Sequence, residues 1–346
     1  MYIFILYITM LLCNRYVGVL DGGSTGTRFF IFGFDNNGYI LKSVWSERIF
    51  GGIAVMSENE IYNSIKPLLN HGEGYLFSNK INPRNVKIAL NATAGVRLLS
   101  YNNQKKVMRA VKNVLRSSNF HVEDRETKVI PGGLEGIYMW ETLYILNLYY
   151  NNENGNIHKK RFGVIEMGGA SAQIAYKLKP RKKNELLLYS ESFLGLGEVE
   201  ALNNLENHKD FHKCKKDIKY CINIIEKILI EVAIPPEDLD QLDHIHLTGY
   251  LYWKLKKYFK NKDRIDTNLS EIKNKFTNAC ISNINTLNRT TGIYQVKENE
   301  ACYSFLYIIK FLEYFNIQNN QKLIILKDVH GFPLEWTLAR AFELLH

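Results

Sequence analysis

Two segments of this sequence repeat one pattern, and their carboxylates lie 145 residues apart. In residues 19–32 an apolar run ends at a carboxylate, Asp21, and continues through two glycines and small hydroxyl residues into a second apolar run. Residues 164–176 have the same order around Glu166. Each segment predicts a strand, a tight glycine turn and a second strand. The repeat therefore predicts a duplicated lobe, with one such turn in each half of the chain.

The two turns have the composition of phosphate-binding loops. Glycine permits a tight turn and leaves backbone N–H groups unobstructed, so that they form a concavity for phosphate oxygens. One such turn alone is more often a plain hairpin, but a pair with a carboxylate at the same offset favours phosphate chemistry. The expected phosphate-binding residues are Gly22, Gly23, Ser24, Thr25, Gly26, Thr27 and Arg28 in the first turn, and Gly168, Gly169, Ala170, Ser171, Ala172 and Gln173 in the second.

The carboxylates Asp21 and Glu166 stand beside these turns, where direct contact with a phosphate would be repulsive. They are suited instead to a hydrated divalent cation, Ca²⁺ or Mg²⁺, because such ions take carboxylate oxygens, and Mg²⁺ in particular keeps several waters. We expect the two turns to face each other and to clamp a di- or triphosphate from both sides.

Helix and strand signals alternate between and after the turns, which indicates an α/β fold. Ser57 is expected to cap a helix whose apolar positions Ile61, Ile65 and Leu68 share one face. The other expected elements are a strand over 86–90, a helix from 100 to 115, a short strand at 129–130, and helices over 135–148, 218–232, 301–315 and 334–345.

Size and composition limit the class of protein. With 346 residues, 46% hydrophobic and 23% charged, the chain suits two globular domains and excludes a disordered chain, a fibrous repeat or a small disulfide scaffold. No apolar run reaches the ~20 residues of a spanning helix, which excludes a polytopic membrane protein. The net charge of +9 comes from scattered Lys and Arg, whose clusters over 179–183, 213–216 and 254–262 fit solvated faces, so we expect no nucleic-acid partner.

The N-terminal region and the cysteines favour the secretory pathway or secretion. Residues 1–13 are expected to be a signal peptide or a short membrane anchor, because residues 2–12 are apolar. Four further cysteines suit two disulfides in an oxidising compartment; three pairings are open, of which we expect the sequential one. They are Cys214, Cys221, Cys280 and Cys302. Glycan acceptor patterns stand at Asn268 and Asn288, whereas Asn91 matches the pattern but is expected to be buried.

Four segments occur in an order that is specific to one family. They are Asp21-Gly-Gly-Ser-Thr-Gly-Thr-Arg28, Ala92-Thr-Ala-Gly-Val-Arg-Leu-Leu99, Gly133-Leu-Glu-Gly-Ile-Tyr-Met-Trp140 and Gly168-Gly-Ala-Ser-Ala-Gln173. They resemble the first four signature segments of the apyrase family, the nucleoside di- and triphosphate diphosphohydrolases, and 192–201 and 336–338 resemble the fifth and the terminal segment. The resemblance implies two actin-like (RNase H-like) lobes with a nucleotide cleft between them, which we place at 14–134 with 330–346 and at 135–329.

The resemblance also implies a role for individual residues. Glu135 would be the general base that activates the attacking water, Ser171 would help to position this water, and Thr93 would lie near the terminal phosphate. Glu135 is expected at the start of a helix, where the helix dipole favours its ionised form. The implied reaction is metal-assisted in-line attack of water on the terminal phosphorus of a nucleoside di- or triphosphate. The aromatic residues considered for base stacking are Tyr250, Tyr252, Trp253, Tyr294, Tyr303 and Phe305.

The chain departs from the family pattern at three positions. Glu166 stands where Asp is usual, Ala172 where Thr is common, and Gly22 where Ala is common. The order Ser-Thr-Gly-Thr-Arg in 24–28 is similar to that of the soluble and Golgi/ER members, which favours a nucleoside diphosphatase. Two alternatives stay open: an exopolyphosphatase or guanosine pentaphosphate phosphatase on the same fold, and a nucleotide-binding protein with weakened catalysis.

Overall fold

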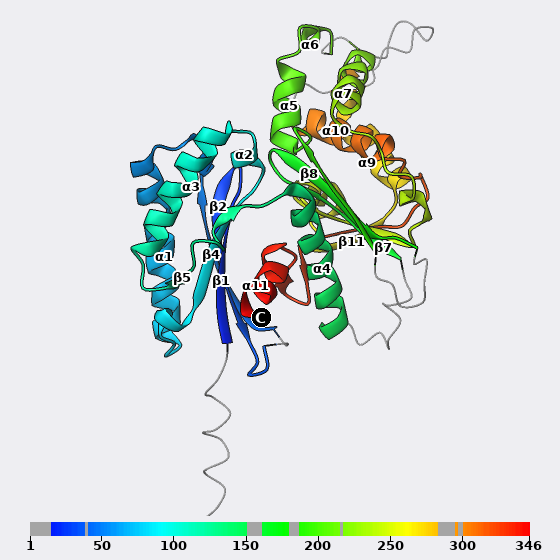
Figure 1. Ribbon diagram of the computed structural model, residues 1–346. Helices are drawn as coiled ribbons and strands as arrows, with labels where there is room; N and C mark the ends of the chain where they lie inside the picture. The colour runs from blue at the N-terminus through cyan, green and yellow to red at the C-terminus, as the bar shows by residue number, and fades with distance from the viewer. Residues whose placement is uncertain are drawn as a thin grey trace, which may run out of the picture. The chain divides into compact units, whose positions relative to one another are not determined.

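The computed structural model describes residues 15–38, 41–150, 161–179, 187–214, 217–282, 295–296 and 300–346 (Figure 1). The expected signal or anchor at residues 1–13 and the acceptor Asn288 lie outside the described residues. The chain divides into two compact parts, which we call unit 1 (Met1–Asn152 with Glu335–His346) and unit 2 (Glu153–Leu334). Within the described ranges, no helix has the length and apolar character needed to cross a membrane.

Unit 1 contains a six-stranded sheet in the order β3-β2-β1-β4-β5, with β6 also paired to β4. The strands β1 (Arg15–Gly22), β2 (Gly26–Phe34) and β3 (Leu41–Phe50) form an antiparallel meander. β4 (Lys87–Ala92) is parallel to β1, and the short β5 (His121–Val122) and β6 (Lys128–Val129) are parallel to β4. Nearly every side chain of β2 is buried, because this aromatic-rich strand is covered on both faces.

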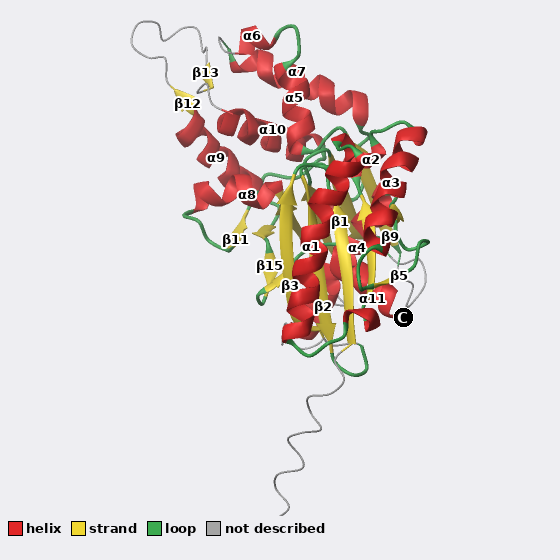
Figure 2. Ribbon diagram, turned by 90° about the vertical axis from the view of Figure 1, so that its left-hand side faces the viewer, coloured by secondary structure: helices red, strands yellow, loops and turns green. Residues whose placement is uncertain are grey.

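Helices cover both faces of this sheet. α1 (Glu58–Ser78), the four-residue α2 (Ala94–Arg97) and α3 (Tyr101–Arg116) follow the strands in sequence, and α1 and α3 lie on one face, which Figure 2 views from the front. α11 (Thr337–Leu345) lies on the other face, and α4 (Gly132–Tyr150) packs on the far side of α11 (Figure 1). Ser57 and Glu60 form a capping box at the start of α1, as the sequence indicates, and its predicted apolar face is buried.

Unit 2 contains a second six-stranded sheet, in the order β11-β14-β10-β7-β8-β9. β7 (Phe162–Met167), β8 (Ser171–Lys177) and β9 (Leu188–Leu194) form an antiparallel meander. β10 (His244–Gly249) is parallel to β7, β14 (Leu323–Leu326) is parallel to β10, and β11 (Arg264–Thr267) is antiparallel to β14. Two small hairpins accompany the sheet: β12 (Ile281–Ser282) with β13 (Gln295–Val296), and β15 (Asp328–Val329) with β16 (Phe332–Pro333).

Most of the helices described in unit 2 lie between its strands in sequence. They are α5 (Glu198–Glu206), α6 (Phe211–Cys214), α7 (Ile218–Val232), α8 (Tyr250–Lys256), α9 (Leu269–Cys280) and α10 (Glu300–Tyr314). α7 has the bounds that the sequence predicts, with its apolar face in the core of unit 2. Asn268 precedes α9, and its Oδ1 accepts a hydrogen bond of 2.9 Å from the N–H of Glu271, which caps the helix.

The four predicted cysteines lie as two sequential pairs at disulfide distance. The Cα atoms of Cys214 and Cys221 are 4.8 Å apart, and those of Cys280 and Cys302 are 5.5 Å apart. Both distances are within the range that a disulfide requires. The two pairs that lie at disulfide distance are the sequential ones, and the disulfide bonds themselves stay a prediction.

The two sheets share one topology. In each, the first strand of an antiparallel meander (β1 or β7) also pairs with a parallel strand (β4 or β10). The predicted duplication of an α/β lobe is therefore confirmed. The units differ in extent from the expected lobes: the division falls after Asn152 rather than after residue 134, because α4 packs on α11 within unit 1.

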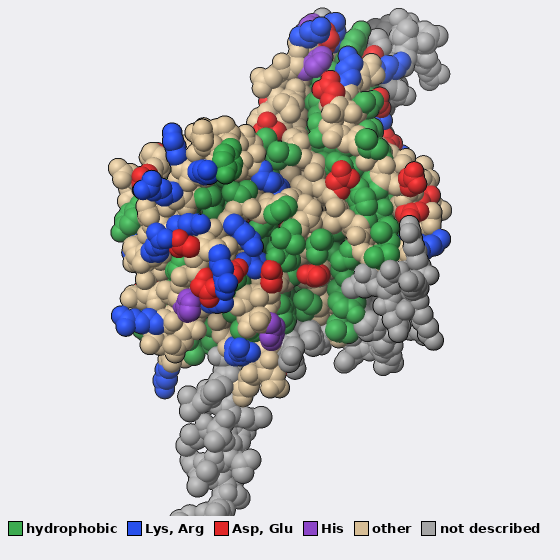
Figure 3. All heavy atoms as spheres, viewed as in Figure 1, with side chains coloured by type: hydrophobic (Ala, Val, Ile, Leu, Met, Phe, Trp, Pro, Cys, Tyr) green, Lys and Arg blue, Asp and Glu red, His purple; other side chains and the backbone are tan. Residues whose placement is uncertain are grey.

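Charged side chains of both signs share the surface. On the face seen in Figure 3, Lys and Arg side chains are interspersed with Asp and Glu. Members of the basic clusters have acidic neighbours: Lys213 Nζ is 2.7 Å from Asp210, and Lys256 Nζ is 3.6 Å from Asp263. These contacts agree with basic residues on solvated faces.

Candidate functional site

The first glycine turn joins β1 to β2. The N–H of Gly23 donates to the carbonyl of Gly26 at 3.0 Å and closes the turn. Gly95, in α2, lies so close that a Cβ there would be 2.8 Å from Ser24 Cα, and a Cβ at Gly52 would be 2.2 Å from the Ser24 carbonyl oxygen. Glycine at both positions therefore allows the backbone to pack tightly against the turn.

A row of four polar residues crosses the sheet beside this turn. The strand register places Asp21 directly between Asn91 of β4 and Arg28 of β2, and Arg28 in turn beside Arg48 of β3. Paired residues on neighbouring strands point to the same face. The neighbouring row contains Gly22 and Thr27, which face the apolar core. The Thr27 side chain is fully buried, so a ligand could contact only the backbone of Thr27 and not its hydroxyl.

Both arginines of the row contact specific oxygens. Arg28 Nη1 lies 2.5 Å from Glu335 Oε1, in an ion pair whose side chains are 30% and 24% exposed. Arg48 Nη2 donates to Thr25, at 3.1 Å to Oγ1 and 3.4 Å to the carbonyl oxygen. Arg28 was predicted to supply a cation to phosphate; its ion pair with the distant Glu335 is a contact that the sequence does not indicate.

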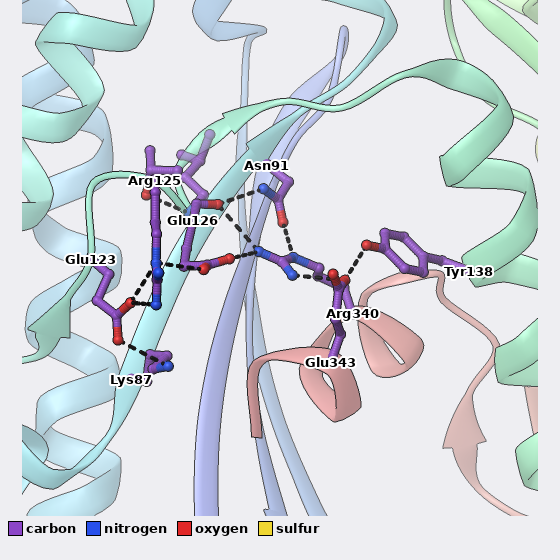
Figure 4. A network of polar contacts seen from close by, with 10 residues as sticks. Lys87, Asn91, Glu123, Arg125, Glu126, Tyr138, Arg340 and Glu343 are labelled. Carbon is purple, nitrogen blue, oxygen red and sulfur yellow. Dashed lines mark hydrogen bonds and ion pairs between the residues drawn. The ribbon is translucent and has the colours of Figure 1, made fainter. Parts of the chain in front are cut away.

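A polar network holds Asn91, the other neighbour of Asp21 (Figure 4). Arg340 of α11 donates through Nε to Asn91 Oδ1 at 3.1 Å, and its Nη2 lies 2.5 Å from Glu126 Oε2. Arg340 Nη1 is 2.7 Å from Glu343, which also accepts from the Tyr138 hydroxyl. Asn91 is buried as expected, and the network explains why an amide is tolerated there: both of its polar groups are bonded.

Asp21 is the exception in this row. Its Oδ1 is buried and has no hydrogen-bond partner among the described residues. Burial and, to a smaller extent, the Glu135 carboxylate raise the pKa of Asp21 to about 8, against the opposing effect of the Arg28 guanidinium. An unpartnered buried carboxylate oxygen is a suitable ligand for a divalent cation, because a cation would stabilise the ionised form that the protein alone disfavours. The residues present therefore fit such an ion.

Glu135 lies in the first turn of α4, as predicted, although the helix begins earlier, at Gly132. Arg97 Nη1 lies 2.8 Å from Glu135 Oε2 and also donates to the carbonyl of Ile130 at 3.2 Å. Burial raises the pKa of Glu135, and the Arg97 guanidinium lowers it. Sequence reasoning missed Arg97, although it stands in the quoted 92–99 segment.

Thr93 follows β4 directly and touches the first turn. Its N–H donates to the Gly22 carbonyl at 3.1 Å, and its hydroxyl oxygen lies 3.4 Å from the same carbonyl oxygen. The structure thus brings Thr93 to the backbone of the turn.

The second turn, in unit 2, repeats the geometry of the first. The N–H of Gly168 donates to the Ser171 carbonyl at 2.9 Å. Glu166 pairs across the hairpin with Gln173, as Asp21 pairs with Arg28. In both hairpins the carboxylate comes two residues before the glycine whose N–H closes the turn. In both it also pairs across the hairpin with the residue that follows it by seven positions.

The segment that resembles the fifth signature supports the second turn. The N–H groups of Gly195, Glu198 and Glu200 donate to the carbonyls of Ala170, Gly168 and Gly169 at 2.8, 3.0 and 3.0 Å. In a trans peptide the C=O group and the N–H group of the next residue point in opposite directions. Since the carbonyls of Gly168 and Gly169 point toward residues 198–200, the N–H groups of Gly169 and Ala170 point away from this segment. A Cβ at Gly197 would lie 2.4 Å from the nitrogens of Ala170 and Ser171, so only glycine permits this approach.

The other predicted residues of this turn are buried. Gln173 Nε2 donates to Ser171 Oγ at 2.6 Å and to Ser192 Oγ at 3.2 Å. Ala172 belongs to the apolar core of unit 2. The hydroxyl that a threonine would place at this position would therefore enter the core rather than the turn.

The described residues also bear on the metal site and on base stacking. Within these ranges, no three His, Cys, Asp or Glu side chains form a cluster that would enclose a metal. Of the aromatic residues considered for base stacking, Tyr252, Tyr303 and Phe305 are part of the apolar core, which corrects that expectation for these three. Trp253 is 55% exposed, and Tyr294 lies outside the described residues.

Sequence comparison relates the chain to nucleotide hydrolases. The model of the GDA1/CD39 (nucleoside phosphatase) family matches residues 12–219. Probable apyrase 4 of Arabidopsis thaliana is 29% identical over 210 residues, which cover 55% of this chain and 41% of the relative. A nucleoside-triphosphatase of Pisum sativum is 32% identical over 175 residues, covering 49% of this chain and 37% of the relative. The chain spans less than half the length of these curated relatives.

Two solved structures share the fold. A nucleoside triphosphate hydrolase structure from Neospora caninum matches with a TM-score of 0.64 and 13% identity, covering 96% of this chain and 93% of the other. A Ppx/GppA family member from Aquifex aeolicus matches with a TM-score of 0.60 and 18% identity, covering 96% and 98%. These likenesses concern the fold alone, and they confirm the expected actin-like α/β fold.

Proposed function

The chain belongs to the GDA1/CD39 (nucleoside phosphatase) family, and from this membership we propose that it hydrolyses the terminal phosphate of nucleoside di- and triphosphates. Nucleoside diphosphates are the favoured substrates in this proposal, because the first turn has the residue order of the soluble and Golgi/ER apyrases.

The observation that carries the proposal is one turn geometry repeated on two sheets. Gly23 and Gly168 close their turns with equivalent hydrogen bonds to the residue three positions later. Asp21 and Glu166 have the same offset from those glycines and the same place in the hairpin register. A hairpin needs no carboxylate at this position, so its repetition supports a shared task, the binding of phosphate and its counter-ion.

The backbone of each turn is proposed to bind phosphate oxygens, and Asp21 and Glu166 to hold a divalent cation, Ca²⁺ or Mg²⁺. When bound, the cation supplies charge neutralisation for the phosphate oxygens. The fit rests on the unpartnered, buried Oδ1 of Asp21. Asp21 must lose its proton to act as a ligand, and Arg28 favours this ionised form.

Glu135 is proposed as the base that takes a proton from the attacking water, with Ser171 and Thr93 as the residues that position water and terminal phosphate. Two features of Glu135 support this role. Its burial raises the carboxyl pKa toward the range in which a base accepts a proton, and Arg97 limits this rise and fixes the orientation of the carboxylate through Oε2.

The test is the Glu135→Gln variant, which keeps the size of the side chain but cannot accept the proton. We expect kcat for UDP or GDP hydrolysis to fall by ~10²–10⁴, the usual contribution of a general base, with nucleotide binding retained. Glu141→Gln, on the same helix, is the matched control and should keep near-normal kcat. Near-normal turnover of Glu135→Gln would remove Glu135 from the role of base.

A second function is supported by the fold likeness to the Ppx/GppA family member. An exopolyphosphatase or guanosine pentaphosphate phosphatase would use the same two turns and an acidic base. Phosphate release from UDP and GDP, compared with release from polyphosphate of defined length, distinguishes the two. Faster release from polyphosphate would favour this second function.

We also propose that the protein works in the secretory pathway or outside the cell, as a disulfide-bonded glycoprotein. The two cysteine pairs at disulfide distance support an oxidising compartment. Peptide mapping without reduction should recover Cys214 with Cys221 and Cys280 with Cys302.

A further inference from the structure

We propose that Glu335 is a positioning residue that holds the Arg28 guanidinium and thereby leaves the Asp21 carboxylate to the divalent cation. The inference rests on the proposed function, in which Asp21 is a ligand of this cation. It assigns a task to a residue that no signature segment contains and that is 307 residues from its partner.

Asp21 and Glu335 compete for one arginine. Asp21 and Arg28 are directly paired on neighbouring antiparallel strands, where Cβ atoms are ~5 Å apart and opposite charges ordinarily bind each other. Arg28 nevertheless reaches Glu335, at 2.5 Å, while Asp21 Oδ1 has no hydrogen-bond partner in the part of the chain described. The competition is therefore decided in favour of Glu335.

The backbone around Glu335 is fixed, so this carboxylate is presented to Arg28 by a firmly held segment. The Glu335 carbonyl accepts from Thr142 Oγ1 of α4 and from the N–H of Leu338, both at 3.1 Å. Thr142 Oγ1 accepts from the N–H of Ala339, also at 3.1 Å. The neighbouring Trp336 is buried and stacks on Tyr138, with ring centroids 6.3 Å apart.

Two other arginines of unit 1 have partners of their own. Arg48 donates to Thr25 and lies over the ring of Phe50, 4.9 Å from its centroid, and Arg97 binds Glu135. Arg28 is the arginine of this group that forms an ion pair with Glu335. Without the Glu335 charge, the nearest carboxylate in the register is Asp21, and its capture of Arg28 would occupy the oxygen that the divalent ion needs.

The experiment measures Ca²⁺ binding by calorimetry without nucleotide, at one fixed pH for the wild type and every variant. We expect Glu335→Gln to weaken Ca²⁺ binding by about tenfold, the equivalent of one charge-assisted hydrogen bond gained by Asp21. Asp124→Asn removes the partner of Arg116 on the surface of unit 1 and is the matched control, with unchanged affinity expected.

A double-mutant cycle separates capture of Asp21 from a general change of charge. Arg28→Ala should raise the Ca²⁺ affinity more in the Glu335→Gln background than in the wild-type background, because only without Glu335 is the Arg28 guanidinium released to bind Asp21. An equal effect of Arg28→Ala in both backgrounds, or normal affinity of Glu335→Gln, would overturn the inference while leaving the proposed function intact. If Asp21→Asn binds Ca²⁺ as the wild type does, the premise itself fails.

Discussion

Binding of a divalent cation to the metal-free protein should release a proton from Asp21. Burial and the Glu135 carboxylate bring the pKa of Asp21 to about 8, against an ordinary value of 3.8. At pH 7 about nine in ten Asp21 carboxyls are then protonated, and a cation that takes up the ionised form releases about 0.9 proton. At pH 9 the release should fall to about 0.1 proton, and the apparent affinity should rise about tenfold between pH 6 and pH 7.

The sign follows from the direction of the shift. The pKa of Asp21 in the folded protein lies above its ordinary value, so the protonated form of Asp21 stabilises the folded, cation-free protein. This contribution is fully present below about pH 4 and is lost as the pH rises to about 8. A bound cation offsets the loss. Calorimetric titration of Ca²⁺ at pH 7 in two buffers with different ionisation enthalpies counts the protons released. Asp21→Asn is the control and should release none. A wild-type protein that binds Ca²⁺ at pH 7 without proton release would refute the electrostatic argument for Asp21.

Three glycine replacements test the packing around the second turn and in helix α1. Gly197→Ala places a Cβ 2.4 Å from backbone nitrogens of the second turn, and the strain of about 1–3 kcal/mol should weaken nucleotide binding by about 5–150-fold in equilibrium titration. In α1, Gly74→Ala meets no atom within 4 Å and should stabilise the protein by about 0.5–1 kcal/mol, whereas Gly72→Ala places a Cβ 2.5 Å from Phe29 and should lower Tm. Equal changes of Tm for Gly74→Ala and Gly72→Ala would contradict the conclusion that only position 74 has room for a Cβ atom.

The sequence predicted those helices and turns whose formation depends on residues close together in the chain. The capping box at Ser57, the apolar periodicity of 218–232 and the repeated glycine turns each depend on residues close in sequence, and each is present. The strands β10 and β14 were missed, because His244–Gly249 has only two apolar residues and Leu323–Leu326 is a four-residue apolar run, both in a helix-rich half of the chain. α4 begins before Glu135, at two glycines whose low helix propensity is overridden by packing on α11.

In the candidate site, too, the sequence predicted the residues of local motifs but not their distant partners. The motif identified Glu135 and Asp21, but not the groups that set their charge. Arg97 is 38 residues from Glu135, and Glu335 is 307 residues from Arg28, so no spacing rule joins either pair. These partners become evident only when the strand register and the return of residues 335–346 to unit 1 are known.

The return of α11 to the first sheet has a consequence for biosynthesis. Arg340 and Trp336 are almost fully buried in unit 1, yet the ribosome adds them after the whole of unit 2. Vectorial synthesis lets an N-terminal region begin folding early, but here the sheet of unit 1 lacks α11 until the whole of unit 2 has been synthesised. The nascent chain therefore exposes an apolar face of β1 and β2 until residues 337–345 have been synthesised and can pack there.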